Sequence, residues 1–244
     1  MSHSYIRPEY SGFVIRTRFY FYNLYFKMLK AVGIEKSYGS LKVLRGIDLL
    51  VQQGEIVSIV GASGAGKSTL LHILGTLDVP DAGDVIINEA QTSALRGKKL
   101  SAFRNAQIGF IFQFHHFLPE FTATENVCLQ AYIGGKKKRE AEAKTKELFE
   151  ILNLSKRAQH LPSELSGGEQ QRVAVARALI NNPTVVLADE PSGNLDSQNA
   201  ETLHELFFTL RKQYHQTFVI ATHNEKLADM TDRKLVMKDG VFVK

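Results

Sequence analysis

Short runs of apolar and β-branched residues alternate with helical patterns along the chain from Met28 onward. The helical patterns cover residues 69–77 and 171–180, and turn pairs such as Gln53-Gly54 and Asp239-Gly240 separate neighbouring elements. Strands that alternate with helices are typical of an α/β domain. The apolar runs predict strands at residues 46–51, 55–60, 85–88, 108–112, 184–188, 217–221 and 234–237.

Residues 120–164 follow a different pattern, because they are polar and helix-prone and contain no convincing strand. Gly134-Gly135 breaks this segment, and the basic run from Lys136 to Arg139 opens a charged helix. Such a run is typical of a solvated helix face rather than of a binding patch. We therefore expect a helical subdomain that is inserted into the α/β domain.

The charge of the chain is concentrated at its start. The 244 residues carry a formal net charge of +5, and residues 1–27 contribute +3 of it and hold nine of the 23 Phe and Tyr residues. One interpretation is an anchor at a membrane surface, because aromatic residues together with Arg suit a lipid interface. The other is an extension upstream of a true start at Met28, because the segment shows no sustained periodicity. Both interpretations stay open. Residues 28–244 are nearly neutral, which gives no electrostatic basis for nucleic-acid binding.

Composition also limits the cellular compartment. No uncharged apolar run approaches the roughly 18 residues that a membrane span needs, and no apolar segment with a cleavage site indicates secretion. Cys128 is the single cysteine, which excludes an internal disulfide framework and a multi-cysteine metal site. These features favour a reducing, cytosolic compartment.

Residues 61–68 carry the first chemical motif. They read Gly-Ala-Ser-Gly-Ala-Gly-Lys-Ser and lie between a predicted strand and a predicted helix, which is the setting of a phosphate-binding loop. The glycines let the backbone approach phosphates, and successive N–H groups at a helix start attract anions. Lys67 would place its charge on the β- and γ-phosphates, and Ser68 would offer an oxygen ligand to Mg²⁺. The segment predicts a nucleoside triphosphate site.

Two acids, Asp189 and Glu190, close the apolar run at residues 184–188. An acid at the carboxyl end of a parallel strand beside a phosphate-binding loop can hold Mg²⁺ directly or through water, and Asp189 takes that role. Glu190 is placed to polarise an attacking water, as general-base catalysis requires. The pair therefore predicts hydrolysis of the nucleotide.

Residues 165–170 read Leu-Ser-Gly-Gly-Glu-Gln and precede the helical pattern at 171–180. Ser166 suits an N-cap position, and the turn forms a second anion-binding helix start. A well-capped helix and an anion site can both hold here. Two phosphate-binding helix starts in one chain suggest that one of them serves the nucleotide of a neighbouring subunit.

The order of these motifs, together with Gln113 after a strand, Asn194-Leu195-Asp196 and His223, resembles the nucleotide-binding subunits of ATP-binding cassette (ABC) transporters. The hexapeptide at 165–170 is highly specific to that family, unlike the phosphate-binding loop alone. The resemblance covers residues 28–244 and leaves residues 1–27 as an extension. It implies a P-loop NTPase core of the α/β class with an antiparallel β subdomain and a helical subdomain at about 120–164.

The resemblance also implies two chains that sandwich two ATP molecules head to tail, each with Mg²⁺. Catalysis would then rest on Glu190 as the base, with His223 on the γ-phosphate, and Gln113 would touch Mg²⁺ or the attacking water. Tyr38 would stack on adenine, and Asp196 would couple the two sites. The other nucleotide contacts would come from Gly61, Ala62, Ser63, Gly64, Ala65, Gly66, Lys67, Ser68 and Thr69 of one chain and from Ser166, Gly167, Gly168 and Glu169 of the other. Metal ligands would be Ser68, Gln113 and Asp189.

Residues 112–127 read Phe-Gln-Phe-His-His-Phe-Leu-Pro-Glu-Phe-Thr-Ala-Thr-Glu-Asn-Val, which is too hydrophobic for a free loop. Exposed, they would form an apolar patch that suits a helix of a partner. A metal site at His115-His116 is not favoured, because adjacent side chains in extended backbone point apart and no third ligand is evident. The segment closely resembles the corresponding one in ATPase subunits of lipoprotein-releasing transporters, and Leu74 to Asp78 matches that branch too.

This branch implies two integral-membrane permease subunits as partners. The chain would lie peripherally on the cytoplasmic face of the inner membrane, held there by these partners, and would power release of lipoproteins toward a periplasmic carrier. Two relatives remain as alternatives: the cell-division ATPase of the FtsE type, which differs in the aromatic segment, and the macrolide-exporter type, which usually carries a fused membrane domain. DNA-binding ABC ATPases fit poorly, because residues 68–165 contain no sustained heptads.

Overall fold

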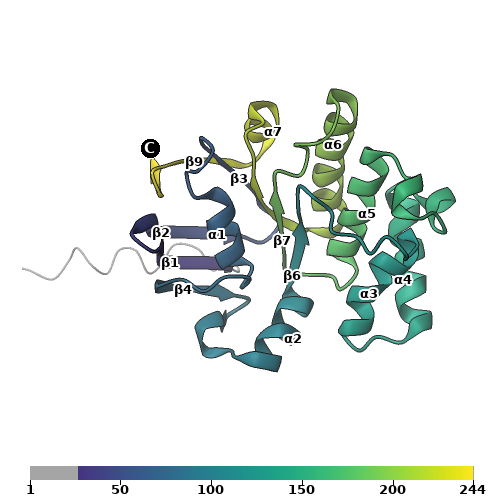
Figure 1. Ribbon diagram of the computed structural model, residues 1–244, viewed down its shortest axis with the longest axis horizontal. Helices are drawn as coiled ribbons and strands as arrows, with labels where there is room; N and C mark the ends of the chain where they lie inside the picture. The colour runs from purple at the N-terminus through teal and green to yellow at the C-terminus, as the bar shows by residue number, and fades with distance from the viewer. Residues whose placement is uncertain (1–26, 244) are drawn as a thin grey trace, which may run out of the picture.

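The computed structural model describes residues 27–243, which form two β-sheets with helices around them (Figure 1). The extension predicted at residues 1–27 lies outside the described residues except for its last position. None of the helices in the described part is both long and apolar enough to cross a membrane.

The larger sheet has the strand order β10-β9-β3-β8-β7-β6. Five of its six strands run parallel, and β10 pairs antiparallel with β9 at one edge. Strands β3, β7 and β8 are apolar almost throughout and buried on both faces, as parallel sheets require. The strand bounds are β3 (Ile56–Val60), β6 (Ile108–Ile111), β7 (Val185–Asp189), β8 (Thr217–Ala221), β9 (Arg233–Lys238) and β10 (Val241–Val243).

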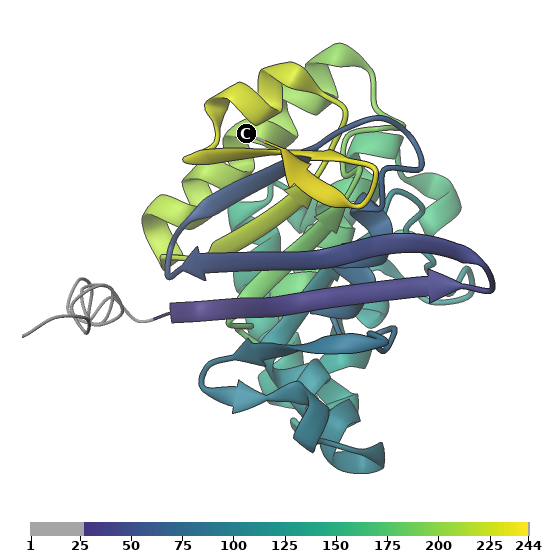
Figure 2. The same ribbon diagram turned by 90° about the vertical axis from the view of Figure 1, so that its left-hand side faces the viewer.

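The smaller sheet is antiparallel and has the order β2-β1-β4-β5. Its strands are β1 (Lys27–Tyr38), β2 (Leu41–Gln52), β4 (Ala82–Ile87) and β5 (Ala90–Gln91). Figure 2 shows the long strands β1 and β2 lying across the strands of the larger sheet. The predicted α/β class and its antiparallel β unit are therefore confirmed.

The two faces of the larger sheet are covered by different helices, and the alternation of side chains along β7 shows it. Val185 and Leu187 pack in one core with α1 (Lys67–Leu74) and the smaller sheet. Val186 and Ala188 pack in the other core with α5 (Gly167–Leu179), α6 (Ser197–Tyr214) and α7 (Glu225–Met230). Helices α1 and α5 consequently lie on opposite faces of the sheet (Figure 1).

Helices α3 (Ala123–Ile133) and α4 (Lys138–Ile151) follow β6, and two short 3-10 turns, Ser155–Arg157 and Pro162–Glu164, lead into α5. Helix α3 begins with a capping box, because the Thr122 side chain accepts from the backbone of Glu125 and the Glu125 side chain accepts from the backbone of Thr122. Ahead of β6 lie a 3-10 turn (Thr92–Ala94) and α2 (Gly97–Gln107). No strand interrupts residues 123–164.

Candidate functional site

The phosphate-binding loop connects β3 to α1 at the carboxyl edge of the larger sheet. Gly66 precedes α1 with φ of +105°, and a Cβ there would lie 2.9 Å from Leu44 Cδ2, so both conformation and space require glycine. Lys67 is buried, and its Nζ donates to the carbonyls of Gly61 at 2.8 Å and Ala62 at 3.1 Å. The ammonium charge is therefore held inside the loop, where it adds to the N–H groups of the helix start as an attraction for anions.

Two of the three predicted metal ligands meet at this edge. Ser68, in the first turn of α1, donates from its Oγ to Asp189 Oδ1 at the end of β7, at 3.0 Å. A hydroxyl and a carboxylate are the hard oxygen donors that Mg²⁺ prefers. The pair thus has the donor chemistry that a nucleotide-bound magnesium ion would need.

Glu190 follows β7 with φ of +46°, an uncommon conformation for a residue with a side chain. Its backbone N–H donates to the carbonyl of Ala221 on β8, at 2.9 Å, which holds it there. Glu190 Oε2 lies 2.8 Å from His223 Nδ1 and also accepts from the backbone N–H of His223 at 3.2 Å. The carboxylate and the imidazole are therefore positioned as a unit, and backbone strain at a carboxylate beside a phosphate-binding loop is typical of a catalytic site.

Gln113, just past β6, is tied to the segment that follows Glu190. Its Nε2 lies 3.3 Å from Asn194 Oδ1, and Asn194 Nδ2 donates to the carbonyl of Gln113 at 3.1 Å. Asp196 caps α6 by accepting from the Asn199 backbone at 2.9 Å, and this hydrogen bond lowers the pKa of the Asp196 carboxyl. These hydrogen bonds tie Gln113 to the segment between β7 and α6, and Asp196 caps the helix that follows this segment.

Residues 166–169 lie on the other face of the sheet, at the start of α5. Glu169 Oε2 accepts from the Ser166 backbone at 2.8 Å, and Ser166 Oγ accepts from the Glu169 backbone at 3.3 Å. A Cβ on Gly168 would lie 2.3 Å from Asn199 Oδ1, so glycine lets α5 and α6 meet closely at their starts. Within residues 27–243, no hydrogen bond or ion pair joins residues 166–169 to the loop at 61–68.

Tyr38 ends β1 about half exposed, and its position depends on two residues that the sequence analysis missed. Its hydroxyl donates to Asp78 Oδ2 at 2.5 Å, and this bond raises the pKa of Tyr38. Lys36 Nζ donates to Asp78 Oδ1 at 2.9 Å and lies 5.2 Å from the centre of the Tyr38 ring. The sequence analysis named Asp78 only as part of the segment from Leu74 to Asp78. Its partners Lys36 and Tyr38 are 42 and 40 positions away in the sequence, so no local pattern indicates these pairs.

A family model described as ABC transporter matches residues 44–193. The chain belongs to the ABC transporter family. A bacterial ABC transporter cassette solved as a dimer is 38% identical, with a TM-score of 0.82 over 89% of this chain and 97% of the cassette. The same cassette in a dimeric post-hydrolysis state with ADP and phosphate gives a TM-score of 0.81 at 38% identity, over 89% of this chain and 97% of that one. The predicted ABC ATPase fold and the predicted ATP-hydrolysing activity are therefore confirmed.

Curated relatives within the family point to one branch. The chain is 66% identical over 217 residues to a lipoprotein-releasing system ATP-binding protein, LolD, of Cytophaga hutchinsonii, which covers 89% of this chain and 99% of that protein. It is 60% identical over 217 residues to the protein of the same name from Bacteroides thetaiotaomicron, covering 89% and 100% of the two chains. These relatives bear out the resemblance to the lipoprotein-releasing branch, and the cell-division and macrolide-exporter alternatives are not favoured.

The aromatic segment of this ABC subunit is divided between core and surface. Phe112 stacks on Phe110 with ring centres 4.8 Å apart, and Phe117 packs against the core, while Phe114 is 66% exposed. A groove beside the segment has a volume of about 450 Å³. It is lined by residues of α2, α3 and β6 and of the loops after α1 and β6, among them Leu77, Arg104, Phe110, Phe112, His116 and Ile133.

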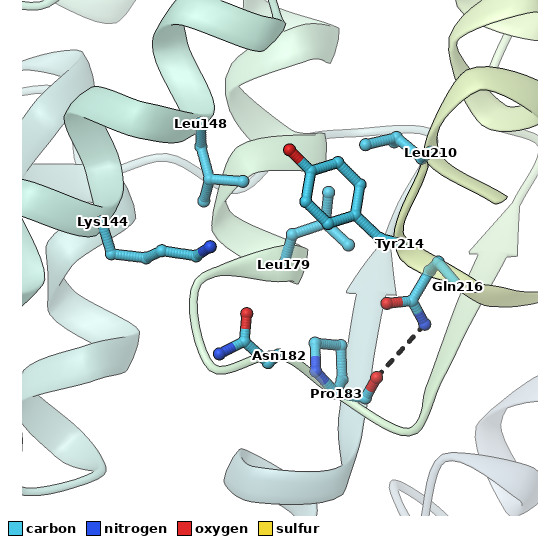
Figure 3. Close-up of a pocket in the computed structure, with 8 residues that line it drawn as sticks. All are labelled: Lys144, Leu148, Leu179, Asn182, Pro183, Leu210, Tyr214 and Gln216. Atoms are coloured by element: carbon cyan, nitrogen blue, oxygen red, sulfur yellow. Dashed lines mark hydrogen bonds between the residues drawn. The ribbon is translucent and has the colours of Figure 1, made fainter. Parts of the chain in front are cut away.

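A smaller hollow lies near the amino ends of β7 and β8, at the edge of the sheet opposite the phosphate-binding loop (Figure 3). Its walls come from α4, α5 and α6, and Gln216 Nε2 donates to the carbonyl of Pro183 at 3.2 Å across one side. Its one charged side chain, Lys144, pairs with Glu147 at 2.8 Å. The hollow is a packing seam and brings together no residues with catalytic chemistry.

Proposed function

We propose that this chain is the ATPase subunit that powers release of lipoproteins from the inner membrane toward a periplasmic carrier. The observation that carries the proposal is the 66% identity over 217 residues to a protein named for that system. Substrate recognition would belong to the membrane partners, since the site described above is built for nucleotide chemistry.

Hydrolysis follows from the carboxylate at the end of β7. Glu190 accepts the proton of a water whose oxygen attacks the γ-phosphorus, while the bond to the β,γ-bridging oxygen breaks and ADP leaves. The contact of Glu190 with His223 Nδ1 keeps the carboxylate and the imidazole oriented together. Lys67 neutralises the charge of the β- and γ-phosphates from inside the loop. The fixed backbone around Glu190 keeps this arrangement preorganised, which lowers the reorganisation needed in the transition state.

Ser68 and Asp189 would hold Mg²⁺, with Gln113 as a further ligand or as a contact of the attacking water. Their oxygen donors and the 3.0 Å separation of Ser68 Oγ and Asp189 Oδ1 support this assignment. When bound, Mg²⁺ supplies charge neutralisation at the β- and γ-phosphate oxygens.

A second copy of the chain completes each site. Helices α1 and α5 cover opposite faces of the sheet, so the start of α5 is separated from the phosphate-binding loop of its own chain. In a head-to-tail dimer, Ser166, Gly167 and Gly168 instead face the γ-phosphate on the partner. The dimeric state of the solved relative supports this arrangement. ATP binding closes the dimer, and hydrolysis allows it to reopen.

Two permease subunits would bind the groove beside the aromatic segment, one on each copy. The groove combines apolar side chains with polar ones such as Arg104, and Gln113 lies two residues after β6, between Phe112 and Phe114. A permease segment seated there contacts the same loop that carries a nucleotide-site residue. Through these contacts the chain is held at the cytoplasmic face of the inner membrane.

Depletion and complementation test this function. In the bacterium that encodes the chain, depletion should leave lipoproteins in the inner membrane, as measured by immunoblots of separated membranes. Wild type should restore release, whereas Glu190→Gln and Lys67→Ala should not. Purified Glu190→Gln should hydrolyse ATP about 100-fold more slowly or worse, because the base is lost, and should form an ATP-bound dimer in sedimentation experiments. Lys67→Ala should bind ATP at least about tenfold more weakly.

Glu201→Gln is the matched control, because Glu201 is an exposed carboxylate on α6 outside the site. It should behave as wild type in every assay. Normal lipoprotein sorting after depletion would contradict the proposed cargo, and a wild-type hydrolysis rate for Glu190→Gln would contradict the assignment of the base.

A further inference from the structure

Arg157 forms an ion pair with the acidic residue of the α5 start. Arg157 Nε donates to Glu169 Oε1 at 2.7 Å, and the Glu169 side chain is only 17% exposed. The other carboxylate oxygen accepts from the Ser166 backbone at 2.8 Å. Arg157 ends the first of the two 3-10 turns between α4 and α5 and lies outside the motif at residues 165–170.

The position of Glu169 creates an electrostatic conflict. Its hydrogen bond with Arg157, followed by the one with the Ser166 backbone, lowers the pKa of Glu169 to about 2, so its carboxylate is negative at neutral pH. A negative side chain in the first turn stabilises the helix, because it interacts with the positive end of the helix dipole. The same charge weakens the attraction of the helix start for a phosphate, since like charges at short range repel.

The backbone around Arg157 is well fixed. Its N–H donates to the carbonyl of Leu154 at 2.8 Å, and its carbonyl accepts from His160 at 3.0 Å. The residues that follow it are bound to the start of α3, because Thr124 donates to the carbonyl of Ala158 through its backbone at 3.0 Å and its Oγ1 at 2.8 Å. The guanidinium is therefore presented to Glu169 by an anchored turn.

We propose that Arg157 is a positioning residue for the ATP-sandwich dimer, which neutralises Glu169 so that the start of α5 can receive the γ-phosphate bound to the partner subunit. The inference rests on the proposed function, because it needs the α5 start to face a nucleotide across a dimer. Arg157 acts through Glu169 and needs no contact with ATP. Its loss affects dimer closure and leaves nucleotide binding at the phosphate-binding loop intact.

The test uses the full chain with the Glu190→Gln substitution, so that ATP hydrolysis does not cause the dimer to dissociate. Four proteins are compared in this background: the parent, Arg157→Gln, Glu169→Gln and the double variant. Sedimentation velocity with ATP and Mg²⁺ measures the dimer dissociation constant, and a fluorescent ATP analogue at low protein concentration measures binding to the monomer. Arg157→Gln should raise the dimer dissociation constant about tenfold, equivalent to about 1.4 kcal/mol, with monomer binding of the analogue changed less than about twofold.

Rescue separates charge neutralisation from a structural role. In the Glu169→Gln background no carboxylate needs neutralising, so adding Arg157→Gln should change the dimer dissociation constant by less than about twofold. Arg157→Lys keeps the charge and should retain most of the parental dimerisation. Raising salt should reduce the difference between Arg157→Gln and the parent, since the added ions screen the carboxylate.

Arg233→Gln is the matched control, because Arg233 forms an ion pair with Glu55 just before β3, at the end of that strand away from the phosphate-binding loop. Arg233 Nε lies 3.0 Å from Glu55 Oε1, with side-chain exposures of 40% and 15% against 43% and 17% for Arg157 and Glu169. Glu55 also accepts from a backbone N–H, that of Gln52, at 2.8 Å. This control should dimerise with ATP as the parent does.

Three outcomes overturn the inference. The first is an Arg157→Gln variant that dimerises as the parent does. The second is an Arg157→Gln substitution that weakens dimerisation equally with and without Glu169→Gln, which would indicate that Arg157 only holds the turn together. The third applies if Arg157→Gln does not fold: the inference is then overturned if Arg157→Lys, which keeps the charge, fails to dimerise. A parent that binds ATP but never dimerises would overturn the proposed sandwich itself, and this result is distinguishable because it requires no Arg157 variant.

Discussion

His115 and His116 are adjacent, yet their surroundings differ. His116 is exposed, whereas His115 is partly buried, and its Nδ1 has no hydrogen-bond partner among residues 27–243. Arg177 donates to the carbonyls of both residues, and its guanidinium lies 4.9 Å from the centre of the Phe117 ring. Burial, followed by the charge of Arg177 and of His116, lowers the pKa of His115 from 6.5 to about 4. At neutral pH the aromatic segment therefore contains a neutral, inward-facing imidazole.

We expect His115 to make the protein less stable in mild acid. In the unfolded chain this imidazole gains its proton as the pH falls through 6.5, but the folded protein takes it up only near pH 4. Between these values the unfolded state binds more protons than the folded state, so the free energy of unfolding decreases as the pH is lowered. Lowering the pH from 7 to 5 should therefore cost the wild type roughly 1–2 kcal/mol more free energy of unfolding than it costs His115→Asn. Urea denaturation at both pH values measures this difference.

His116→Asn controls for the change of residue type at the exposed neighbour. The interpretation fails if His115→Asn and wild type lose the same free energy of unfolding between the two pH values.

One amide holds the part of the aromatic segment from Leu118 to Phe121 in its shape. Asn126, in the first turns of α3, is 3% exposed. Its Oδ1 accepts from the Leu118 backbone at 2.9 Å, and its Nδ2 donates to the carbonyls of Leu118 at 3.1 Å and Phe121 at 2.8 Å. Helix α3 thereby fixes the loop that exposes Phe114 and Leu118. The amide supplies the backbone partners that a sheet or helix would otherwise provide.

Asn126→Ala should lower the free energy of unfolding by about 1–3 kcal/mol, because it removes the hydrogen-bond partner of the Leu118 N–H and of the Leu118 and Phe121 carbonyls. Chemical denaturation at pH 7 measures the change. Gln198→Ala, which removes an exposed amide on α6, should change the stability by less than about 0.5 kcal/mol. Equal stabilities of Asn126→Ala and Gln198→Ala would show that the loop does not depend on this side chain.

Residues 123–164 share a core with the larger sheet. Phe149 and Leu148 of α4 belong to the same buried cluster as Val186 of β7 and Phe218 of β8. Cys128 of α3 is part of that cluster as well. The proposed helical subdomain therefore has no separate core, and we expect it to unfold together with the strands that carry the nucleotide site.

Phe149→Ala tests this cooperativity at the scale of the whole molecule. The side chain is 1% exposed, so its removal should cost about 3–5 kcal/mol. Circular dichroism and binding of a fluorescent ATP analogue should lose their signals at the same, lower urea concentration. Ile133→Ala, at a position on α3 that is 64% exposed, should change the midpoint little. Two separate transitions for Phe149→Ala would show that the helical part unfolds on its own.

Most of the architecture could be predicted from the chain, because its signals are local. Buried parallel strands such as β7 and β8 are continuous apolar runs, and their predicted bounds differ from the observed ones by one residue at most. The antiparallel strands were harder. Strand β2 begins at Leu41 rather than at Gly46, because Lys42 and Arg45 interrupt the apolar residues of its first half. The pairs Asp78 with Tyr38 and Arg157 with Glu169 had no pattern to indicate them.

The sequence alone determined the family, the nucleotide chemistry and the order of the motifs, because a phosphate-binding loop or a capped helix start is built from consecutive residues whose spacing is visible in the chain. Only the tertiary structure decided which distant groups meet. Ser68 and Asp189 are 121 positions apart, and Glu190 and His223 are 33 apart. Such contacts depend on strand order and on which face of the sheet each helix covers, and these follow from packing of the whole chain.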